Sequence, residues 1–133
     1  MDNLNILEQY AHFVDAVTSD ASKNNEVFIA RLQELSDQGI DIARLTTAGM
    51  GLAGEAGETV DLVKKVLFHG KAYTDEIKEK LILESGDVSW YWMNLCIAIG
   101  VNPIDVLIKN IEKLQTRYPG GKFSVERSEN RIV

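Results

Sequence analysis

The sequence predicts an all-α fold, and three observations support this prediction. Only two of the 133 residues are proline. Apolar residues recur at spacings of three and four, as on one face of a helix, and the long segments lack the alternation of half-buried strands. Capping residues and glycines stand where the periodic segments begin and end. The chain is long enough for one core but short for two, so we expect a single domain, residues 1–133, folded as a four- to five-helix bundle.

Two helices are expected in the N-terminal part. The first covers about Leu4–Val17, with apolar residues three or four positions apart. The polar run Thr18–Asn25 should end it. The second covers about Asn25–Gln38, and Gly39 is suited to its C-terminal end.

Two longer helices should follow. The first of them opens near Asp41 and continues to Phe68, where Gly70 supplies a C-terminal signal. The next begins after Thr74, an N-cap residue followed by acidic residues in the first turn, and continues to about Ile99.

A fifth helix has the clearest start, because Asn102 is a good N-cap and Pro103 suits the first helical position. The turn residues Tyr118–Gly121 end it about four turns later. From Lys122 onward the polar tail is expected to be a surface loop.

The charge balance argues against broad contact with nucleic acid or with an anionic membrane. The chain has 20 acidic and 14 basic residues, a formal net charge of −6. A phosphate-bearing ligand must then be held locally. The segment 109–131 carries net positive charge, which makes it either an anion contact or a solvated extension.

The compartment expected from the sequence is the cytoplasm, that of the host if the chain is phage-encoded. Cys96 is the only cysteine, and the Met1 end lacks a basic region followed by an apolar stretch. Apolar stretches such as Leu95–Gly100 are shorter than the roughly 20 residues that span a bilayer. No contact with a membrane is expected.

Two pairs of acidic residues carry the functional signal. The stretch GEAGE contains Glu55 and Glu58, and the stretch ESGD contains Glu84 and Asp87. Residues three apart lie on one face of a helix, so each pair can reach one cation. Like charges so placed repel each other, and a single pair of this kind is often only a solvated helix face.

The apolar neighbours of these acids favour a metal site. On the two expected long helices, Glu55 and Glu84 stand in rows that are otherwise largely apolar. Burying unpaired carboxylates is costly, and a bound cation would offset that cost. Oxygen ligands without histidine select Mg²⁺, with Mn²⁺ as a possible substitute. The row that contains Glu84 is Ile77, Leu81, Glu84, Val88, Tyr91, Leu95 and Ala98.

The stretches GLAGEAGETVDLVKKVLFHGK, LILESGDVSWYWMNL and NIEKLQTRYPGGKFSVERSENR resemble the MazG-like all-α nucleoside triphosphate pyrophosphohydrolases, particularly short phage and bacterial forms. The resemblance covers about residues 46–131. It implies that the four carboxylates bind Mg²⁺ and that water attacks the α-phosphorus, giving a nucleoside monophosphate and pyrophosphate. Ser85 departs from the family pattern, in which leucine is usual, but the ligand pattern is intact.

The resemblance and the surroundings of the acids also suggest residues that bind substrate. Lysines after the first acid pair and polar residues of the last long helix would contact phosphate, although each lysine taken alone is more often a solvated surface residue. Aromatic residues after the second acid pair could stack on the base or fill the core. The expected substrate-binding residues are Lys64, Lys65, Lys71, Trp90, Asn94, Asn110, Lys113, Arg117 and Tyr118.

Two other signals are set aside. Residues 49–54 spell GxGxxG, but a helical segment precedes them, whereas the dinucleotide fingerprint follows a strand. A di-iron bundle would need Glu-x-x-His, which neither acid pair provides. Gly51, Gly54 and Gly57 more plausibly form a small-residue face on which another helix packs closely.

The expected assembly is a homodimer or a homotetramer, because the long helices are apolar around most of their circumference and need cover. The expected substrate is a purine nucleoside triphosphate such as dGTP or GTP. A non-enzymatic helical dimerisation or adaptor module, whose acids bind a basic partner, is the alternative.

Overall fold

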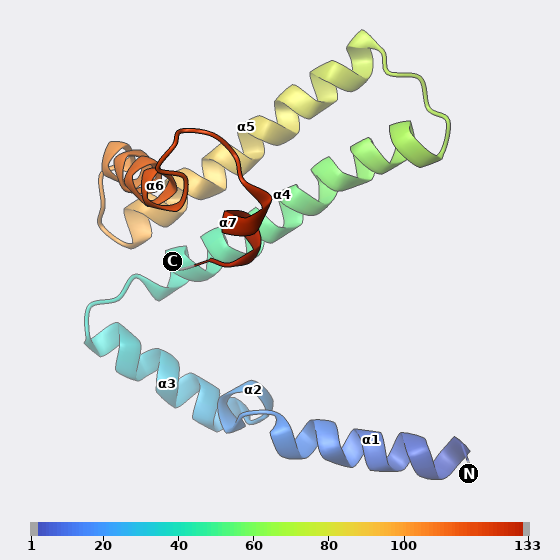
Figure 1. Cartoon of the computed structure of the whole chain (residues 1–133). Helices are drawn as coiled ribbons and strands as arrows, with labels where there is room; N and C mark the ends of the chain where they lie inside the picture. Colours follow the sequence, from blue (N-terminus) through green and yellow to red (C-terminus); the bar gives the residue numbers. More distant parts are fainter. Residues whose placement is uncertain (1–2, 132–133) are drawn as a thin grey trace. The chain divides into compact units, whose positions relative to one another are not determined.

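The computed structural model describes residues 3–131, with side chains from residue 5 onward, and every regular element in this range is an α-helix (Figure 1). The prediction of an all-α fold is confirmed. The chain divides into two compact units, Met1–Ile42 and Ala43–Val133, each taken separately below; the single domain stays a prediction. The helices are α1 (Asn3–Val17), α2 (Asp20–Lys23), α3 (Asn25–Asp37), α4 (Ile42–Phe68), α5 (Asp75–Ala98), α6 (Pro103–Arg117) and α7 (Val125–Glu129).

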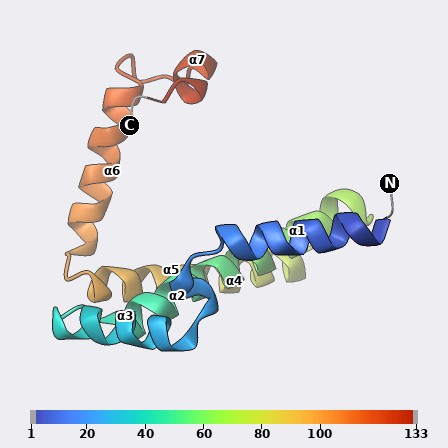
Figure 2. The same cartoon turned by 90° about the horizontal axis from the view of Figure 1, so that it is seen from below.

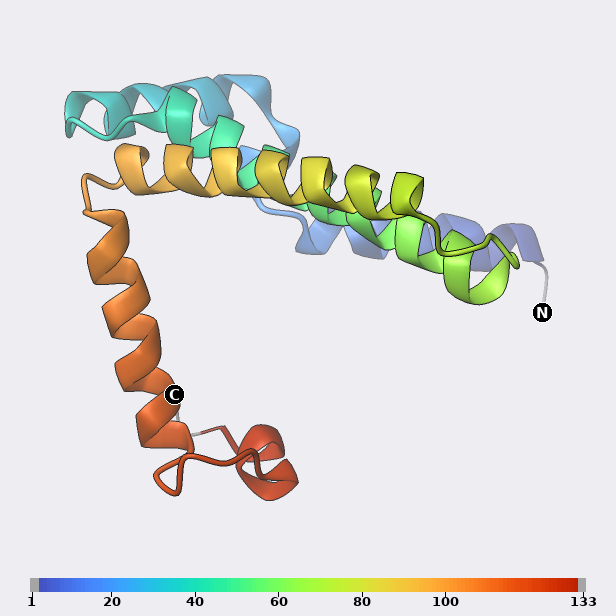
Figure 3. The same ribbon diagram turned by 90° about the horizontal axis from the view of Figure 1, so that it is seen from above.

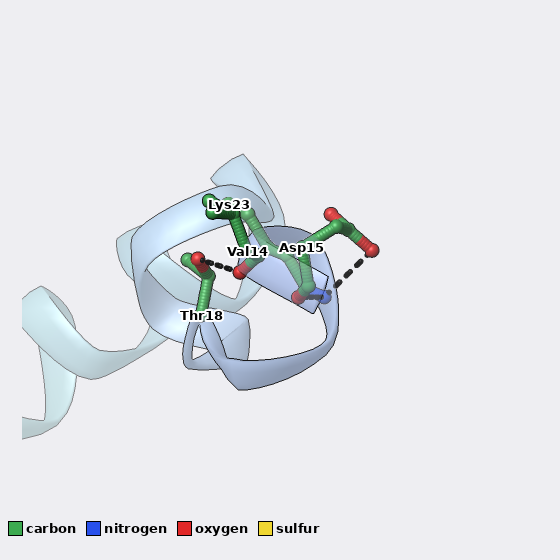
Figure 4. A network of polar contacts seen from close by, with 4 residues as sticks. All are labelled: Val14, Asp15, Thr18 and Lys23. Carbon is green, nitrogen blue, oxygen red and sulfur yellow. Dashed lines mark hydrogen bonds and ion pairs between the residues drawn. The ribbon is translucent and has the colours of Figure 1, made fainter. Parts of the chain in front are cut away.

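The N-terminal unit turns sharply after α1. Thr18 Oγ1 donates a hydrogen bond to the Val14 carbonyl at 2.6 Å, and Lys23 Nζ contacts both the carbonyl and the carboxylate of Asp15 (Figure 4). These bonds hold the one-turn helix α2 against the end of α1. The sequence analysis was wrong to leave this polar run without a helix. Asp20 in its first turn and Lys23 in its last suit the helix dipole.

The boundaries of α3 follow from its caps. Asn24 Oδ1 accepts hydrogen bonds from the backbone N–H groups of Glu26 and Val27, and Gly39 follows the helix with a φ of +80°. The predicted helix ends are confirmed here within one or two residues. The expected contribution of Leu4 to the apolar face of α1 lies outside the described side chains.

In the second unit, α4 and α5 run antiparallel and side by side (Figures 1 and 3). Gly70, with a φ of +66°, lets the chain leave α4, and Thr74 begins α5 by accepting a hydrogen bond from the Ile77 N–H. Both boundaries agree with the prediction. Local signals, a glycine after α4 and a capping threonine before α5, therefore define the loop that connects the two helices.

The close approach of α4 to α5 occurs at Gly51. A Cβ added there would overlap ring carbons of Tyr91. At Gly54 and Gly57 an added Cβ would meet nothing within 4 Å among the described residues, apart from the neighbouring backbone of α4 itself. The predicted small-residue contact is thus confirmed at Gly51 and wrong, within the described chain, at the other two glycines.

Helix α6 begins as predicted, since Asn102 Oδ1 accepts a hydrogen bond from the Ile104 N–H and Pro103 occupies the first turn. It leaves α5 at an angle of 98° (Figure 2). Within residues 3–131 no single helix is long and apolar enough to cross a membrane; α5 and α6, bent at 98°, meet that criterion of length and composition only as a pair.

The tail after α6 is not entirely a loop, which corrects the sequence analysis. Ser124 Oγ accepts a hydrogen bond from the Arg127 N–H and begins α7. The ring of Phe123 lies 5.9 Å from that of Tyr118, centroid to centroid. The capping serine satisfies a backbone N–H group in the first turn of α7, where the helix itself offers no acceptor.

The small core of the described chain lies in the α4–α5 hairpin. Ala48, Ile77 and Cys96 are its buried hydrophobic residues, as expected of Cys96. Large apolar side chains are exposed on α1, α3, α4, α5 and α6, and on α1 and α6 they lie along one face of the helix. The side chains of these two faces are Ile6, Leu7, Tyr10, Phe13, Val14 and Val17 on α1, and Ile104, Leu107, Ile108, Ile111 and Leu114 on α6.

A matched pair of substitutions tests the helix contact. We expect Gly51→Ala to lower the free energy of unfolding by about 1–3 kcal/mol, because the new methyl group collides with Tyr91. Gly54→Ala should raise it by up to about 1 kcal/mol, because alanine favours the helix and meets free space. Urea unfolding followed by circular dichroism measures both. Equal effects of the two substitutions would contradict the close approach.

Candidate acidic site

Three of the four predicted carboxylates converge. Glu55 and Glu58 of α4 and Glu84 of α5 each offer an oxygen, and these oxygens lie within 4.8 Å of one another. Helical geometry explains this arrangement. Glu58 lies seven residues after Gly51, and Glu84 lies seven residues before Tyr91. Seven residues make almost two full turns, so around the helix axis each acid lies within about 20° of its contact residue, Gly51 on α4 or Tyr91 on α5.

On both α4 and α5, the row of residues that contains an acid, as predicted from the sequence, is the row that is at least partly buried. Glu55 and Glu84 are partly buried, whereas Glu58 is exposed at the edge of the hairpin. In the row of Glu84, Ile77 is buried and the remaining members are partly buried. The acids therefore share the helix faces that carry the packing.

The carboxyl group of Glu84 has a raised pKa. Burial raises the pKa of its carboxyl group, and the charges of Glu58, Glu55 and Asp87 raise it further, as does a hydrogen bond with the side chain of Glu55. Its Oε2 atom is enclosed and has no hydrogen-bond partner among the described residues. This is where a proton or a cation would be most stabilising.

An open cavity of about 450 Å³ adjoins Glu84. Its presence depends partly on two glycines of α4, whose missing side chains leave the space free. The polar side chains at the cavity come from both helices. The described residues that line it are Gly54, Gly57, Glu58, Asp61, Leu62 and Glu84.

Asp61 was missed by the sequence analysis. Its carboxylate contacts Lys64 Nζ at 2.8 Å and Lys65 Nζ at 2.5 Å. Hydrogen bonds from these two lysines lower the pKa of Asp61 to about 2. The signal that could have found it is its spacing, because Asp61 continues the three-residue interval of Glu55 and Glu58.

Asp87 lies outside the group of three oxygens. It is exposed on α5, one turn after Glu84, and close enough for its charge to raise the pKa of Glu84. Its predicted role as a fourth ligand stays a prediction.

Asn94 and Trp90 lie further along α5. The Asn94 side chain is buried, donates to the Trp90 carbonyl at 3.0 Å and accepts from Arg44 Nη1 at 2.9 Å. Asn94 therefore joins α5 to the start of α4, a contact the sequence analysis did not foresee. Trp90 is exposed and packs edge-on against Tyr91, at 4.9 Å between centroids. The proposed base contacts of Trp90 and Asn94 stay predictions.

The other predicted substrate residues are not brought to the cavity. Lys71 is exposed. The pKa of Glu76 is lowered mainly by its hydrogen bond with Lys80, and the charge of Lys71 adds to this effect. On α6 and just after it, Asn110 and Lys113 are exposed, and Tyr118 lines a separate, largely apolar cavity of about 320 Å³. Arg117, like Tyr118, is partly buried at the C-terminal end of α6.

Comparison with known proteins finds a similarity to a phage protein. The Gene 37 protein of Mycobacterium phage L5 is 40% identical to the chain over 81 residues, which make up 60% of the chain and 71% of that protein. No family model matches the chain. No solved structure matches it either.

The raised pKa of Glu84 predicts how stability changes with pH. The folded state holds this proton more tightly than the unfolded state, so unfolding free energy should fall as pH rises above the ordinary value of 4.5. In EDTA, the unfolding free energy of Glu84→Gln should fall less between pH 4.5 and pH 8 than that of wild type. Thermal unfolding across this pH range measures the difference. Glu76→Gln is the control. A hydrogen bond with Lys80 lowers the pKa of Glu76, so the stability that Glu76 contributes is lost as the pH falls, the opposite direction to Glu84. Parallel curves for wild type and Glu84→Gln would refute the interpretation.

Proposed function

The chain belongs to the same family as the Gene 37 protein of Mycobacterium phage L5, and we propose that it is a Mg²⁺-dependent, MazG-like nucleoside triphosphate pyrophosphohydrolase. One observation carries the proposal. Glu55, Glu58 and Glu84 converge, and the enclosed Oε2 atom of Glu84 lacks a partner among the described residues. The resemblance of the sequence to MazG-like enzymes supplies the reaction.

The donor set fits a hard divalent cation. All three converging groups offer oxygen, and their mutual repulsion would be relieved by positive charge between them. Glu55, Glu58 and Glu84 would hold Mg²⁺ or Mn²⁺, with Asp87 one turn away as a further ligand. Bound there, the cation would neutralise triphosphate charge and lower the pKa of a water molecule.

Residues that do not line the cavity would complete the substrate site. Lys64 and Lys65 contact Asp61, which lines the cavity, and would bind phosphate oxygens. The exposed ring of Trp90 offers a face on which the base could stack. In the proposed reaction, a bond forms between the water oxygen and the α-phosphorus. The bond from the α-phosphorus to the bridging oxygen breaks, and pyrophosphate leaves.

A second copy of the chain is part of the proposal. The apolar face of α6 is exposed, and the basic residues Lys113 and Arg117 do not line the cavity of their own chain. In a dimer or a tetramer the apolar faces would be covered. Phosphate contacts could then come from the partner copy.

The adaptor alternative also has an observation in its favour. The exposed apolar faces of α1 and α6 are typical of surfaces that bind other helices. An adaptor would bind a partner without releasing pyrophosphate. Product analysis therefore separates the two functions.

The activity is tested with Glu58→Gln. We expect wild type with Mg²⁺ to release pyrophosphate from a nucleoside triphosphate, tried first with dGTP, and to leave diphosphates largely uncleaved. Glu58→Gln should lower turnover on the order of 100-fold or more, the scale for losing one group that stabilises the transition state. Its melting temperature in EDTA should be no lower than that of wild type.

The matched control Glu79→Gln changes an exposed acid of α5 outside the cavity. Stepwise release of orthophosphate would contradict the assignment.

The assembly is tested by light scattering at micromolar concentration. The monomer mass is 14.8 kDa. We expect at least twice this mass, because a single copy leaves large apolar side chains on α1 and α6 exposed. A fully active monomer would contradict the proposed assembly.

A further inference from the structure

Asp61 is placed between the acidic group and the lysines. It lines the cavity together with Glu58 and Glu84, yet it is not one of the three converging carboxylates. Around α4 it lies about 80° from Gly51, whereas Glu58 lies about 20° from it. Asp61 therefore lines the cavity further from the helix contact than Glu58 does. Lys64 and Lys65, which contact Asp61, do not line the cavity, and we call this edge of the cavity its rim.

Two ammonium groups are held by this one carboxylate. Lys64 Nζ and Lys65 Nζ lie 2.8 Å and 2.5 Å from the two Asp61 oxygens. All three side chains are 42–48% exposed, so the ion pairs add little to the stability of the fold. Their main consequence is the position of the positive charges, beside a cavity whose other charged groups are acidic.

Lysine needs such an anchor for precise placement. Its side chain is flexible and strongly hydrated, and without a fixed partner the ammonium group spreads over many positions. An ammonium group has three donors, so a bond to Asp61 leaves donors for a second acceptor. A phosphate oxygen beside the rim could therefore be bound without breaking the contact to Asp61.

We propose that Asp61 is a positioning residue that fixes Lys64 and Lys65 at the rim of the acidic cavity, where they bind the phosphate groups of the substrate. The inference rests on the proposed function. It differs from a metal-ligand role, because here Asp61 acts through the lysines.

The test begins with Asp61→Asn in the full chain. Asparagine keeps the size of the side chain and removes the charge that holds both lysines. We expect KM for the nucleoside triphosphate to rise about tenfold, as for the loss of one charge-assisted hydrogen bond, with kcat changed less than about threefold. Calorimetry with inorganic pyrophosphate and Mg²⁺ should show a similar loss of affinity, at an unchanged melting temperature.

The matched control is Glu76→Gln. It removes another exposed ion pair within one helix, that of Glu76 with Lys80 on α5, at 2.8 Å. Neither residue lines the cavity. This variant should keep the wild-type KM and pyrophosphate affinity. An equal change in both variants would mean a general charge effect and would overturn the inference.

A double-mutant cycle decides whether Asp61 acts through the lysines. With Lys64 and Lys65 both replaced by methionine, adding Asp61→Asn should change KM and pyrophosphate affinity no further. A full additional effect in that background would assign Asp61 a direct role and overturn the inference. Asp61→Glu, which keeps the charge, should retain most of the affinity and replaces Asp61→Asn if that variant does not fold.

The failure of this inference is distinct from failure of the proposed function. Wild type that releases pyrophosphate while Asp61→Asn is unchanged overturns the role of Asp61 alone. Wild type that neither binds nor releases pyrophosphate overturns both.

Discussion

The contact between Gly51 and Tyr91 is the constraint on which the site depends. Because glycine has no side chain, α4 and α5 approach closely there and run antiparallel in one register. In that register Glu58 lies two turns beyond Gly51, and Glu84 lies two turns before Tyr91, on the faces that meet. Slipping either helix by a residue would rotate its acids by about 100° and separate them.

The position of the acids is unfavourable for the stability of the hairpin. The covered faces of a two-helix hairpin are its main resource for burial, and here they also carry carboxylates that repel one another. The buried hydrophobic core of the described chain is correspondingly small. Binding of a cation would relieve the repulsion, and cover from another copy would add burial. In this interpretation, ligand binding and assembly both compensate for the acids on the helix faces that meet.

Local signals in the sequence predicted most of the helix boundaries, because caps such as Thr74 and Asn102 act within one turn. The short helices α2 and α7 were missed, since one turn shows no periodicity to detect. The convergence of three acids followed from spacing and apolar neighbours. The contact of Arg44 with Asn94 joins positions 50 residues apart and leaves no local pattern. Asp61 did leave a local pattern, the continued three-residue spacing of acids. Its spacing to Lys64 and Lys65, however, is also typical of an ordinary ion pair on a helix surface.

The glycines of α4 show how one repeated residue serves two purposes. A step of three residues turns about 300° around a helix, so each successive glycine is displaced by about 60° from the previous one. Gly51 faces Tyr91 and allows contact, whereas Gly57, about 120° away from it, borders the cavity. Each glycine costs about 1 kcal/mol of helix propensity relative to alanine. At Gly51 helix packing compensates for that cost. At Gly54 and Gly57 no described atom lies within reach of a missing Cβ, so what these glycines provide is space, and that space lies beside the acids.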